Sequence, residues 1–269
     1  MTQEWADRKN KEQEARIAEA REKVVSFINA MPQASDQIKA TLIDKLKKEE
    51  QSNYPYFYAW KWRVLDYFDD MEDWDKQFES MNIFEEYDKA LSWRGAYNRY
   101  VDSEPKHFSG DIIITDPCYI IPNEKSKRDD WHKCDCGREM EALGIHNYMT
   151  RDTLYGDWSC TTYNMDTKEA IGSFCADAGL VSVFHLDEVL AYNPQYENEL
   201  SKKWTVTLIR DFEGEVQFVV KMETGQYDYD TKWWKVGDVW EDYVVQVIGR
   251  GVNKKTGEPI NFITSQTGL

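Results

Sequence analysis

The sequence predicts an α+β protein: an N-terminal helical arm or bundle, rich in aromatic residues, followed by a mostly antiparallel β domain. Three observations support this fold class. Residues 1–31 are highly charged and contain neither Gly nor Pro, which favours helix. Aromatic residues crowd positions 54–100. After position 105, short apolar runs alternate with Gly- and Pro-containing turns, as in antiparallel sheets.

The composition is strongly acidic. The chain of 269 residues has 33 Lys and Arg against 49 Asp and Glu, which gives a formal net charge of −16. Such a surface repels phosphate backbones and anionic membranes, so we expect neither direct nucleic-acid binding nor a membrane partner. It suits docking on a basic protein surface, including one that normally holds DNA.

The location of the protein is predicted from two absences in the sequence. There is no apolar run long enough to span a bilayer and no signal-peptide pattern at Met1, so we expect a cytoplasmic protein. Five cysteines without a framework spacing predict reduced thiols rather than disulfides.

The first helix is expected within residues 1–31, packed only toward its end. Its first two turns have little to bury beyond Trp5, so we expect them to project or fray. The apolar positions with helical spacing are Ile17, Val24, Val25 and Ile28. A second helix, capped by Ser35 or Asp36, should follow. It carries apolar residues four apart, at Ile38, Leu42 and Leu46.

The aromatic-rich segment has two interpretations. The rings could form the core of a small helical bundle, which is the common arrangement. They could also form a protein–protein surface, because a short bundle has little interior for so many rings and aromatic side chains are enriched at interface hot spots. The predicted partner contacts are Tyr54, Tyr56, Trp60, Trp62 and Tyr97. Pro105 marks the predicted boundary between a helical region, 1–104, and a β domain, 105–269.

Within the β domain, several strands can be anticipated in order. A hairpin is predicted at Asp211-Phe212-Glu213-Gly214, because the glycine can adopt a positive φ. A short helix is predicted at 186–192, stopped by Asn193-Pro194. The expected strands include 110–121, 181–186, 204–210, 215–222, 240–249 and 259–264, the last two joined by a turn at 253–257.

One loop offers a candidate zinc site. His132, Cys134, Cys136 and His146 supply the imidazole and thiolate ligands that zinc prefers. The His-x-Cys-x-Cys spacing is tighter than in a usual zinc knuckle. The competing interpretation is a set of reduced, partly buried thiols beside a surface histidine.

A second candidate site consists of Asp116, Asp157, Asp177 and His185. If these converged, they could bind a divalent cation or perform acid–base chemistry, as in a metal-dependent hydrolase or a nucleotide-binding protein. Alternatively, aspartates beside Pro117, Gly156 and Gly179 form turns and caps, which is their commonest role. Cys118 and Cys160 lie in apolar contexts expected to bury them as inert thiols. Glycine-rich phosphate loops, nucleophile elbows and His-Glu-x-x-His motifs are missing from the sequence, so we predict a protein without catalytic residues.

Three segments carry a resemblance to a known family. Residues 114–119 (Ile-Thr-Asp-Pro-Cys-Tyr), 155–160 (Tyr-Gly-Asp-Trp-Ser-Cys) and 174–179 (Phe-Cys-Ala-Asp-Ala-Gly) are similar to segments of small phage-encoded β proteins. Among these, the chain most resembles the phage Gabija anti-defence inhibitors, mainly over residues 110–220.

The resemblance implies a non-enzymatic inhibitor without a cofactor, which assembles as a homo-oligomer in the cytoplasm of the bacterial host. Its implied partner is the bacterial Gabija nuclease–helicase complex, which it would keep from engaging or cutting DNA. The expected mechanism is steric and electrostatic occlusion of a basic DNA-handling surface.

Overall fold

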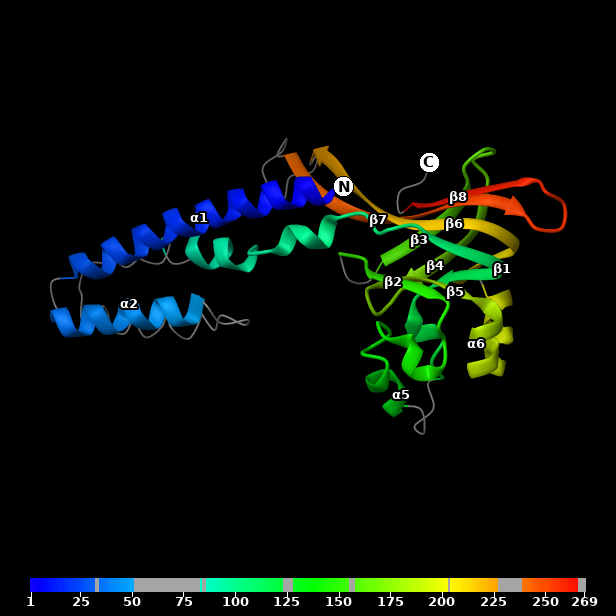
Figure 1. Cartoon of the computed structure of the whole chain (residues 1–269), viewed down its shortest axis with the longest axis horizontal. Coiled ribbons are helices and arrows are strands. Elements are labelled where there is room, and N and C mark those ends of the chain that lie inside the picture. Colours follow the sequence, from blue (N-terminus) through cyan, green and yellow to red (C-terminus); the bar gives the residue numbers. More distant parts are fainter. Residues whose placement is uncertain are drawn as a thin grey trace. The chain divides into compact units, whose positions relative to one another are not determined.

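The chain forms two compact units in a computed structural model. One unit comprises residues 2–101, and the other comprises Met1 together with residues 102–269. The structure describes residues 1–31, 34–50, 83, 86–122, 128–154, 158–202, 204–226 and 239–265. Together the two units establish the predicted α+β class (Figure 1).

The helical unit is built on α1 (Gln3–Ala30) and α2 (Asp36–Glu50), with a further helical stretch at 86–92 and the 3₁₀-helix η1 (Ala96–Tyr100). Side-chain caps begin both long helices. The Thr2 hydroxyl accepts a hydrogen bond from the Trp5 amide at 3.2 Å, and the Ser35 hydroxyl accepts one from the Ile38 amide at 3.4 Å. Ser35 is therefore the cap of the second helix.

The core of the helical unit joins one stripe of α1 to one stripe of α2. Three of the four apolar positions predicted in α1 are fully buried, and Val25 is partly buried against the same core. The buried members of this cluster are Ile17, Ala20, Val24, Ile28, Met31, Ala34, Leu42, Leu46, Tyr87, Ala90 and Leu91. The four-residue spacing in α2 therefore does mark its buried face.

The expectation that the start of α1 projects or frays is wrong. The helix is regular from Gln3, and the buried Gln13 donates from Nε2 to the Ala90 carbonyl at 2.6 Å. Trp5 packs edge-on against Tyr97 and Tyr100, with ring centroids 5.7 and 6.5 Å apart. Because these partners come from about ninety residues later in the sequence, local spacing gave no sign of them.

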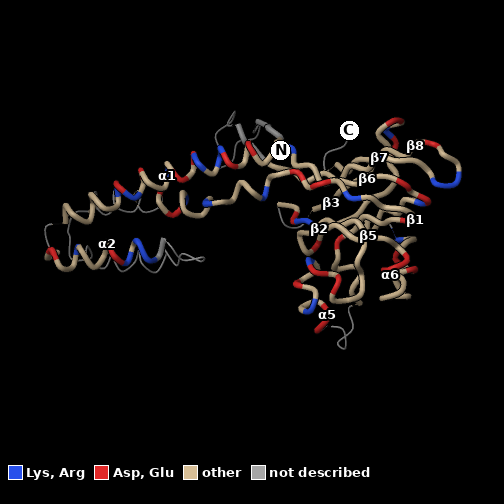
Figure 2. Tube along the Cα trace, viewed as in Figure 1, with Lys and Arg blue, Asp and Glu red and all other residues tan. Residues whose placement is uncertain are grey.

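Charges of both signs are interspersed along α1 (Figure 2). Lys23 pairs with Glu19 and with Glu86 of the neighbouring helical stretch, and Arg94 pairs with Glu14 at 3.0 Å. All of these pairs are largely exposed, so solvent screens them and they add little to the stability of the unit. Burial of the apolar stripe, rather than ion pairing, stabilises the unit.

Among the residues of the β unit that the structure describes, eight strands form an antiparallel sheet in the order β2-β5-β1-β6-β4-β3-β8-β7. Its strands are β1 (Lys106–Thr115), β2 (Tyr148–Asp152), β3 (Trp158–Asn164), β4 (Ala170–Ala176), β5 (Leu180–His185), β6 (Thr205–Gln226), β7 (Val239–Asn253) and β8 (Pro259–Ser265). Because β6 also pairs with β7, the strands β6, β4, β3, β8 and β7 close into a ring. Strands β1, β5 and β2 extend the sheet from β6.

The hairpin predicted at 211–214 is wrong, because β6 runs through these residues as a continuous strand. Its partners there are β1 on one edge and β7 on the other. Arg210 and Asp211 together oppose Asp111, which makes a β-bulge, and Asp211 takes the positive φ of 53°. The Asp111 carboxylate accepts from the Asp211 amide at 2.8 Å and pairs with Arg210 at 3.1 Å.

Gly214, interpreted from the sequence as a turn residue, permits two strands to approach closely. A Cβ at this position would lie 2.3 Å from the Arg250 carbonyl oxygen and 2.5 Å from the Gly251 Cα. Gly251 lies opposite Gly214 in the β6–β7 register. The glycine thus serves the contact between β6 and β7 rather than chain reversal.

Short helices cover one face of the sheet (Figure 1). These are the 3₁₀-helix η2 (Pro117–Tyr119), α5 (Arg128–Lys133), the 3₁₀-helix η4 (Met140–Leu143), α6 (Leu186–Tyr192) and the 3₁₀-helix η5 (Pro194–Ser201). Ile113 and Phe184 of the sheet pack with Val189 and Tyr196 of these helices. The predicted helix 186–192, ending before Asn193-Pro194, is confirmed.

The predicted turn between the last two strands is also confirmed. The Asn253 side chain accepts from the amides of Lys255 and Thr256, and Gly257 has a φ of 74°.

In the part of the chain that the structure describes, none of the helices combines the length and apolar character needed to cross a membrane.

Candidate functional site

Asp116, one of the predicted acid–base residues, is fully buried at the end of β1. Its carboxylate accepts hydrogen bonds from the backbone amides of Cys118 and Ala178, both at 2.8 Å, and from that of Leu180 at 3.4 Å. Burial raises the pKa of this carboxyl, and the amide donors oppose that rise. Asp116 thus caps η2 and holds the β4–β5 turn, the role expected of a turn-forming aspartate.

Asp177 lies in the same turn and is exposed. Its carboxylate accepts a hydrogen bond of 2.5 Å from the Tyr119 hydroxyl. Burial and this carboxylate together raise the pKa of Tyr119. The third predicted aspartate, Asp157, lies outside the described residues. Asp116 therefore contacts the turn that contains Asp177; the Asp116 carboxylate accepts from backbone amides and the Asp177 carboxylate accepts from a tyrosine hydroxyl.

His185 is not part of that turn. It lies at the opposite end of β5, where it pairs with Ile112, whereas Ser182 pairs with Thr115 beside Asp116. Four residues of strand separate Ile112 from Asp116, which is roughly 13 Å. The His185 ring donates from Nε2 to the Ser109 carbonyl at 2.8 Å. Gly110 leaves room for it, because a Cβ there would lie 2.8 Å from Nε2.

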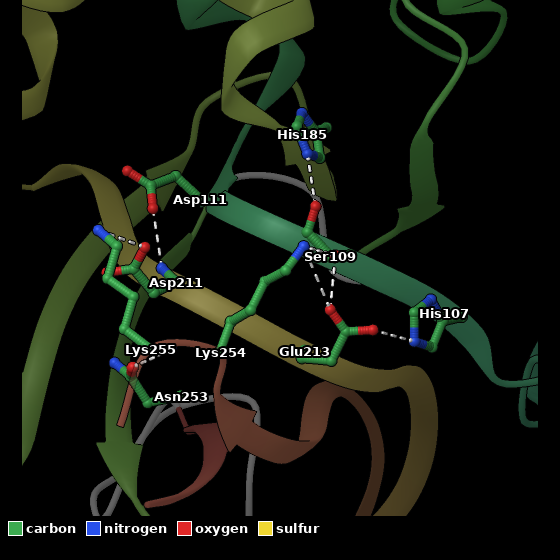
Figure 3. Close-up of polar contacts among 9 residues, drawn as sticks. All are labelled: His107, Ser109, Asp111, His185, Asp211, Glu213, Asn253, Lys254 and Lys255. Carbon is green, nitrogen blue, oxygen red and sulfur yellow. Dashed lines mark hydrogen bonds and ion pairs between the residues drawn. The ribbon is translucent and has the colours of Figure 1, made fainter. Parts of the chain in front are cut away.

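Ser109 belongs to a polar network between β1, β6 and the turn after β7 (Figure 3). Its hydroxyl donates to a Glu213 carboxylate oxygen at 2.5 Å and accepts from the Lys254 ammonium at 2.9 Å. The other Glu213 oxygen pairs with His107 at 3.0 Å. A neighbouring pair joins Lys255 to Asp211 at 2.9 Å. Sequence reasoning missed this network because its members come from three distant segments.

The geometry of this network does not activate Ser109 as a nucleophile. A nucleophilic hydroxyl needs a neutral imidazole or amine as its base. Here Lys254 is largely exposed and donates to the hydroxyl, while both histidines contact other atoms. The network instead links the turn at 253–257 to the middle of β1 through the hydrogen bond from Lys254 to Ser109.

The network should be sensitive to acid through Glu213. The Ser109 hydroxyl, followed by Lys254 and His107, lowers the pKa of Glu213 below its usual value of 4.5. A carboxyl with a lowered folded-state pKa adds stability above its unfolded pKa and loses it as the pH falls through the folded value. We expect Glu213→Gln to flatten the decline in melting temperature below about pH 4.5. Parallel melts of both proteins between neutral pH and pH 3 measure this, and unchanged acid sensitivity in the variant would contradict it.

The structure does not gather the candidate zinc ligands. Cys134 is buried in the core beneath the sheet and directs its thiol to the Trp131 carbonyl at 3.3 Å. His132 and His146 are exposed, and Cys136 has a φ of 53° in the turn after α5. Among the described residues, no group of three or more His, Cys, Asp and Glu side chains could hold a metal ion. Cys136 and its neighbours shape a tight turn.

The two cysteines expected to be inert differ in burial. Burial raises the pKa of Cys160 to about 12, which disfavours the thiolate. Cys118 is half-buried, and burial together with Asp116 raises the pKa of its thiol as well. All five cysteines are free thiols.

One of the five predicted partner contacts, Tyr97, lies in the described part of the helical unit. It is half-buried in a ring cluster with Trp5, Trp93 and Tyr100. Trp93 stacks on Tyr100 and remains 41% exposed. The other predicted contacts, Tyr54, Tyr56, Trp60 and Trp62, lie outside the described residues. The cluster presents an exposed aromatic face while Tyr100 is buried behind it.

A groove of about 1300 Å³ opens between η2, α5 and η5 in the β unit. Tyr119, Trp131 and Tyr196 supply aromatic surface, and Gln195 and Asn198 supply amides. Asn193 is fixed at one side by donating to the Ile120 carbonyl at 2.8 Å. Sequence reasoning missed this groove, because three segments far apart in the chain line it.

No protein-family model, curated protein sequence or solved structure matches this chain.

Proposed function

We propose that this protein is a non-enzymatic inhibitor that binds a bacterial defence nuclease–helicase complex of the Gabija type and covers its DNA-handling surface. The observation that carries the proposal is the ring cluster of the helical unit, in which Trp93 is 41% exposed beside Tyr97. Exposed aromatic rings held in place by their neighbours are what interface hot spots use, since little side-chain entropy is lost on binding.

Two further features support a binding role. The described residues considered for acid–base chemistry, Asp116, Asp177 and His185, each hold a hydrogen bond that stabilises the fold. The formal charge of −16 favours encounter with a basic surface and disfavours direct contact with DNA. An acidic protein that occupies a DNA-handling surface would compete with DNA both sterically and electrostatically.

The test uses the full chain and a purified Gabija nuclease–helicase complex. We expect a stable complex in size-exclusion chromatography with light scattering, reduced DNA cleavage, and binding that weakens as salt is raised. The same measurement on the free chain should give a mass greater than one subunit. A Trp93→Ala/Tyr97→Ala double variant should bind at least about tenfold more weakly, a loss of about 1.4 kcal/mol.

The matched control is Val252→Ala, which removes an exposed apolar side chain from the β unit and should bind like the wild type. Failure of the wild-type chain to bind the complex, or full DNA cleavage in its presence, would reject the proposed function. Equal binding by the double variant and the wild type would reject the ring cluster as the contact.

A further inference from the structure

The groove between η2, α5 and η5 offers no unpaired carboxylate or ammonium to a ligand. Among the lining residues that the structure describes, Glu199 is the one carboxylate and Lys202 the one ammonium, and the two pair at 2.6 Å. Burial raises the pKa of Cys118 and the pKa of Tyr119, so both of these lining groups stay neutral near neutral pH. A charged ligand would lose water here without gaining a free opposite charge, so the groove favours a neutral one.

Two aromatic rings line the groove, and each is only partly exposed. Tyr119 of η2 and Trp131 of α5 both pack in part against the hydrophobic core that the short helices form with the sheet. The Tyr119 hydroxyl also donates to Asp177 at 2.5 Å, which fixes the ring. Rings held in this way lose little conformational entropy when a ligand packs on their open surface. They favour a ligand that presents C–H groups to an aromatic face.

Two side-chain amides share one face of η5. Gln195 and Asn198 are three residues apart, and such residues on a 3₁₀-helix stand one above the other, about 6 Å apart along the axis. Both line the groove, are exposed, and make no side-chain hydrogen bond to any residue that the structure describes. An amide donates through its nitrogen and accepts through its oxygen, so each one can bond two neighbouring hydroxyl groups.

These groups disfavour two other kinds of neutral ligand. A purely apolar molecule would take the amides out of water without giving them a hydrogen bond, which costs free energy. An extended peptide gains much of its affinity by main-chain pairing at a strand edge, whereas η2, α5 and η5 are helical and use backbone groups internally. A ligand with many hydroxyl groups and apolar C–H faces matches both the amides and the rings.

We propose that this groove binds a neutral carbohydrate, with sugar rings packed on Trp131 and Tyr119 and hydroxyl groups bonded to Gln195 and Asn198. The volume of about 1300 Å³ exceeds the range of about 300–1,000 Å³ typical of small-molecule pockets, so the groove has room for more than one sugar unit. Cleavage of a glycosidic bond takes two carboxyl groups, and the described lining supplies only Glu199, which is paired. The site is therefore one for binding, and it goes beyond the proposed inhibition because it uses none of the ring cluster of the helical unit.

The test is isothermal titration calorimetry of the full chain with two neutral, β-linked hexasaccharides, cellohexaose and N-acetylchitohexaose. We expect saturable binding of at least one of them, with a dissociation constant below about 1 mM. The glucosamine hexamer has the same linkage and a positive charge on each ring. It should bind at least about tenfold more weakly than the better neutral ligand, because its charges find no free partner in the groove.

The variants test the two kinds of contact separately. Gln195→Ala/Asn198→Ala should weaken binding at least about tenfold, because the sugar hydroxyl groups lose their partners. Both side chains are exposed, so this variant should fold, which thermal melting checks. Trp131→Ala should weaken binding as well, whereas Trp131→Phe keeps an aromatic face and should bind within about threefold of the wild type. The matched control is Glu197→Gln, an exposed change on the same helix outside the groove lining, which should bind like the wild type.

Four results would overturn the carbohydrate site. These are no saturable binding of either neutral hexasaccharide, equal binding of the glucosamine hexamer, unchanged affinity in a folded Gln195→Ala/Asn198→Ala variant, and displacement of the hexasaccharide by an equal concentration of adenosine. The last result would indicate a site for a nucleobase instead. The titrations contain no defence complex, so a negative result would leave the proposed inhibition standing, and failure to bind the complex would leave the groove standing.

Discussion

Replacing Asp116 with alanine should lower the free energy of unfolding of the β unit by about 3–5 kcal/mol. The carboxylate accepts from three backbone amides, those of Cys118, Ala178 and Leu180, in a buried position. Each donor left without an acceptor costs about 1–3 kcal/mol, and the removed side chain leaves a cavity as well. Urea unfolding followed by circular dichroism measures the loss.

Two variants define the effect of Asp116 further. Asp116→Asn keeps one acceptor oxygen, so its loss should be smaller than that of the alanine variant. Asp177→Asn changes an exposed carboxylate in the same turn and should cost less than about 1 kcal/mol. A loss below 1 kcal/mol in Asp116→Ala would show that the turn does not depend on this carboxylate.

Acid should act on Asp116 and Glu213 in opposite senses. Burial raises the pKa of Asp116, so its contribution to stability is complete below the unfolded value and is lost as the pH rises through the folded value. The lowered pKa of Glu213 makes its contribution disappear as the pH falls. Acid should therefore remove a stabilising contribution at Glu213 but not at Asp116.

Gly214→Ala should destabilise the β unit by about 3 kcal/mol. The added Cβ would lie 2.3 Å from the Arg250 carbonyl oxygen and 2.5 Å from the Gly251 Cα, and both obstacles are backbone atoms of the paired strand. Hydrogen-bonded backbone atoms of paired strands cannot rotate away from the new Cβ as a flexible side chain can. Strands β6 and β7 would therefore have to separate. Thermal and urea unfolding of the purified variant measure the loss.

The matched control for Gly214 is Gly144→Ala. A Cβ at Gly144 would meet no atom within 4 Å, but the φ of 81° is unfavourable for alanine. The control should therefore cost only about 1–2 kcal/mol, from backbone strain alone. If both variants were equally stable, close approach of the strands would not be the reason for glycine at 214.

Local sequence patterns predicted what depends on neighbours along the chain. The stripe in α2, the helix that stops before Asn193 and the turn around Asn253 each follow from spacing or side-chain capping within a few residues. The prediction failed at Gly214 because the same residue type serves turns and close strand contacts. It failed at the start of α1 because Tyr97 and Tyr100, which cover Trp5, are far away in the sequence.

The candidate site was less predictable because its residues come from distant parts of the chain. Of the predicted acid–base residues, Asp116 contacts the turn that contains Asp177, and His185 lies at the other end of its strand. Strand alternation cannot tell which end of a strand meets which loop until the pairing register is known. The groove depends on three segments whose meeting is set by the sheet order.

The ring of strands has a consequence for synthesis of the protein in the cell. Strand β3 is completed only when Thr161 pairs with Ser265 of β8, so the first and last parts of the ring are about a hundred residues apart. On the ribosome, β3 must wait with one edge open until β8 has emerged, whereas β4 can pair with β6 earlier. The ring should therefore close only after β8 has been synthesised, and the interval before β8 arrives is when chaperones would protect the open edge of β3.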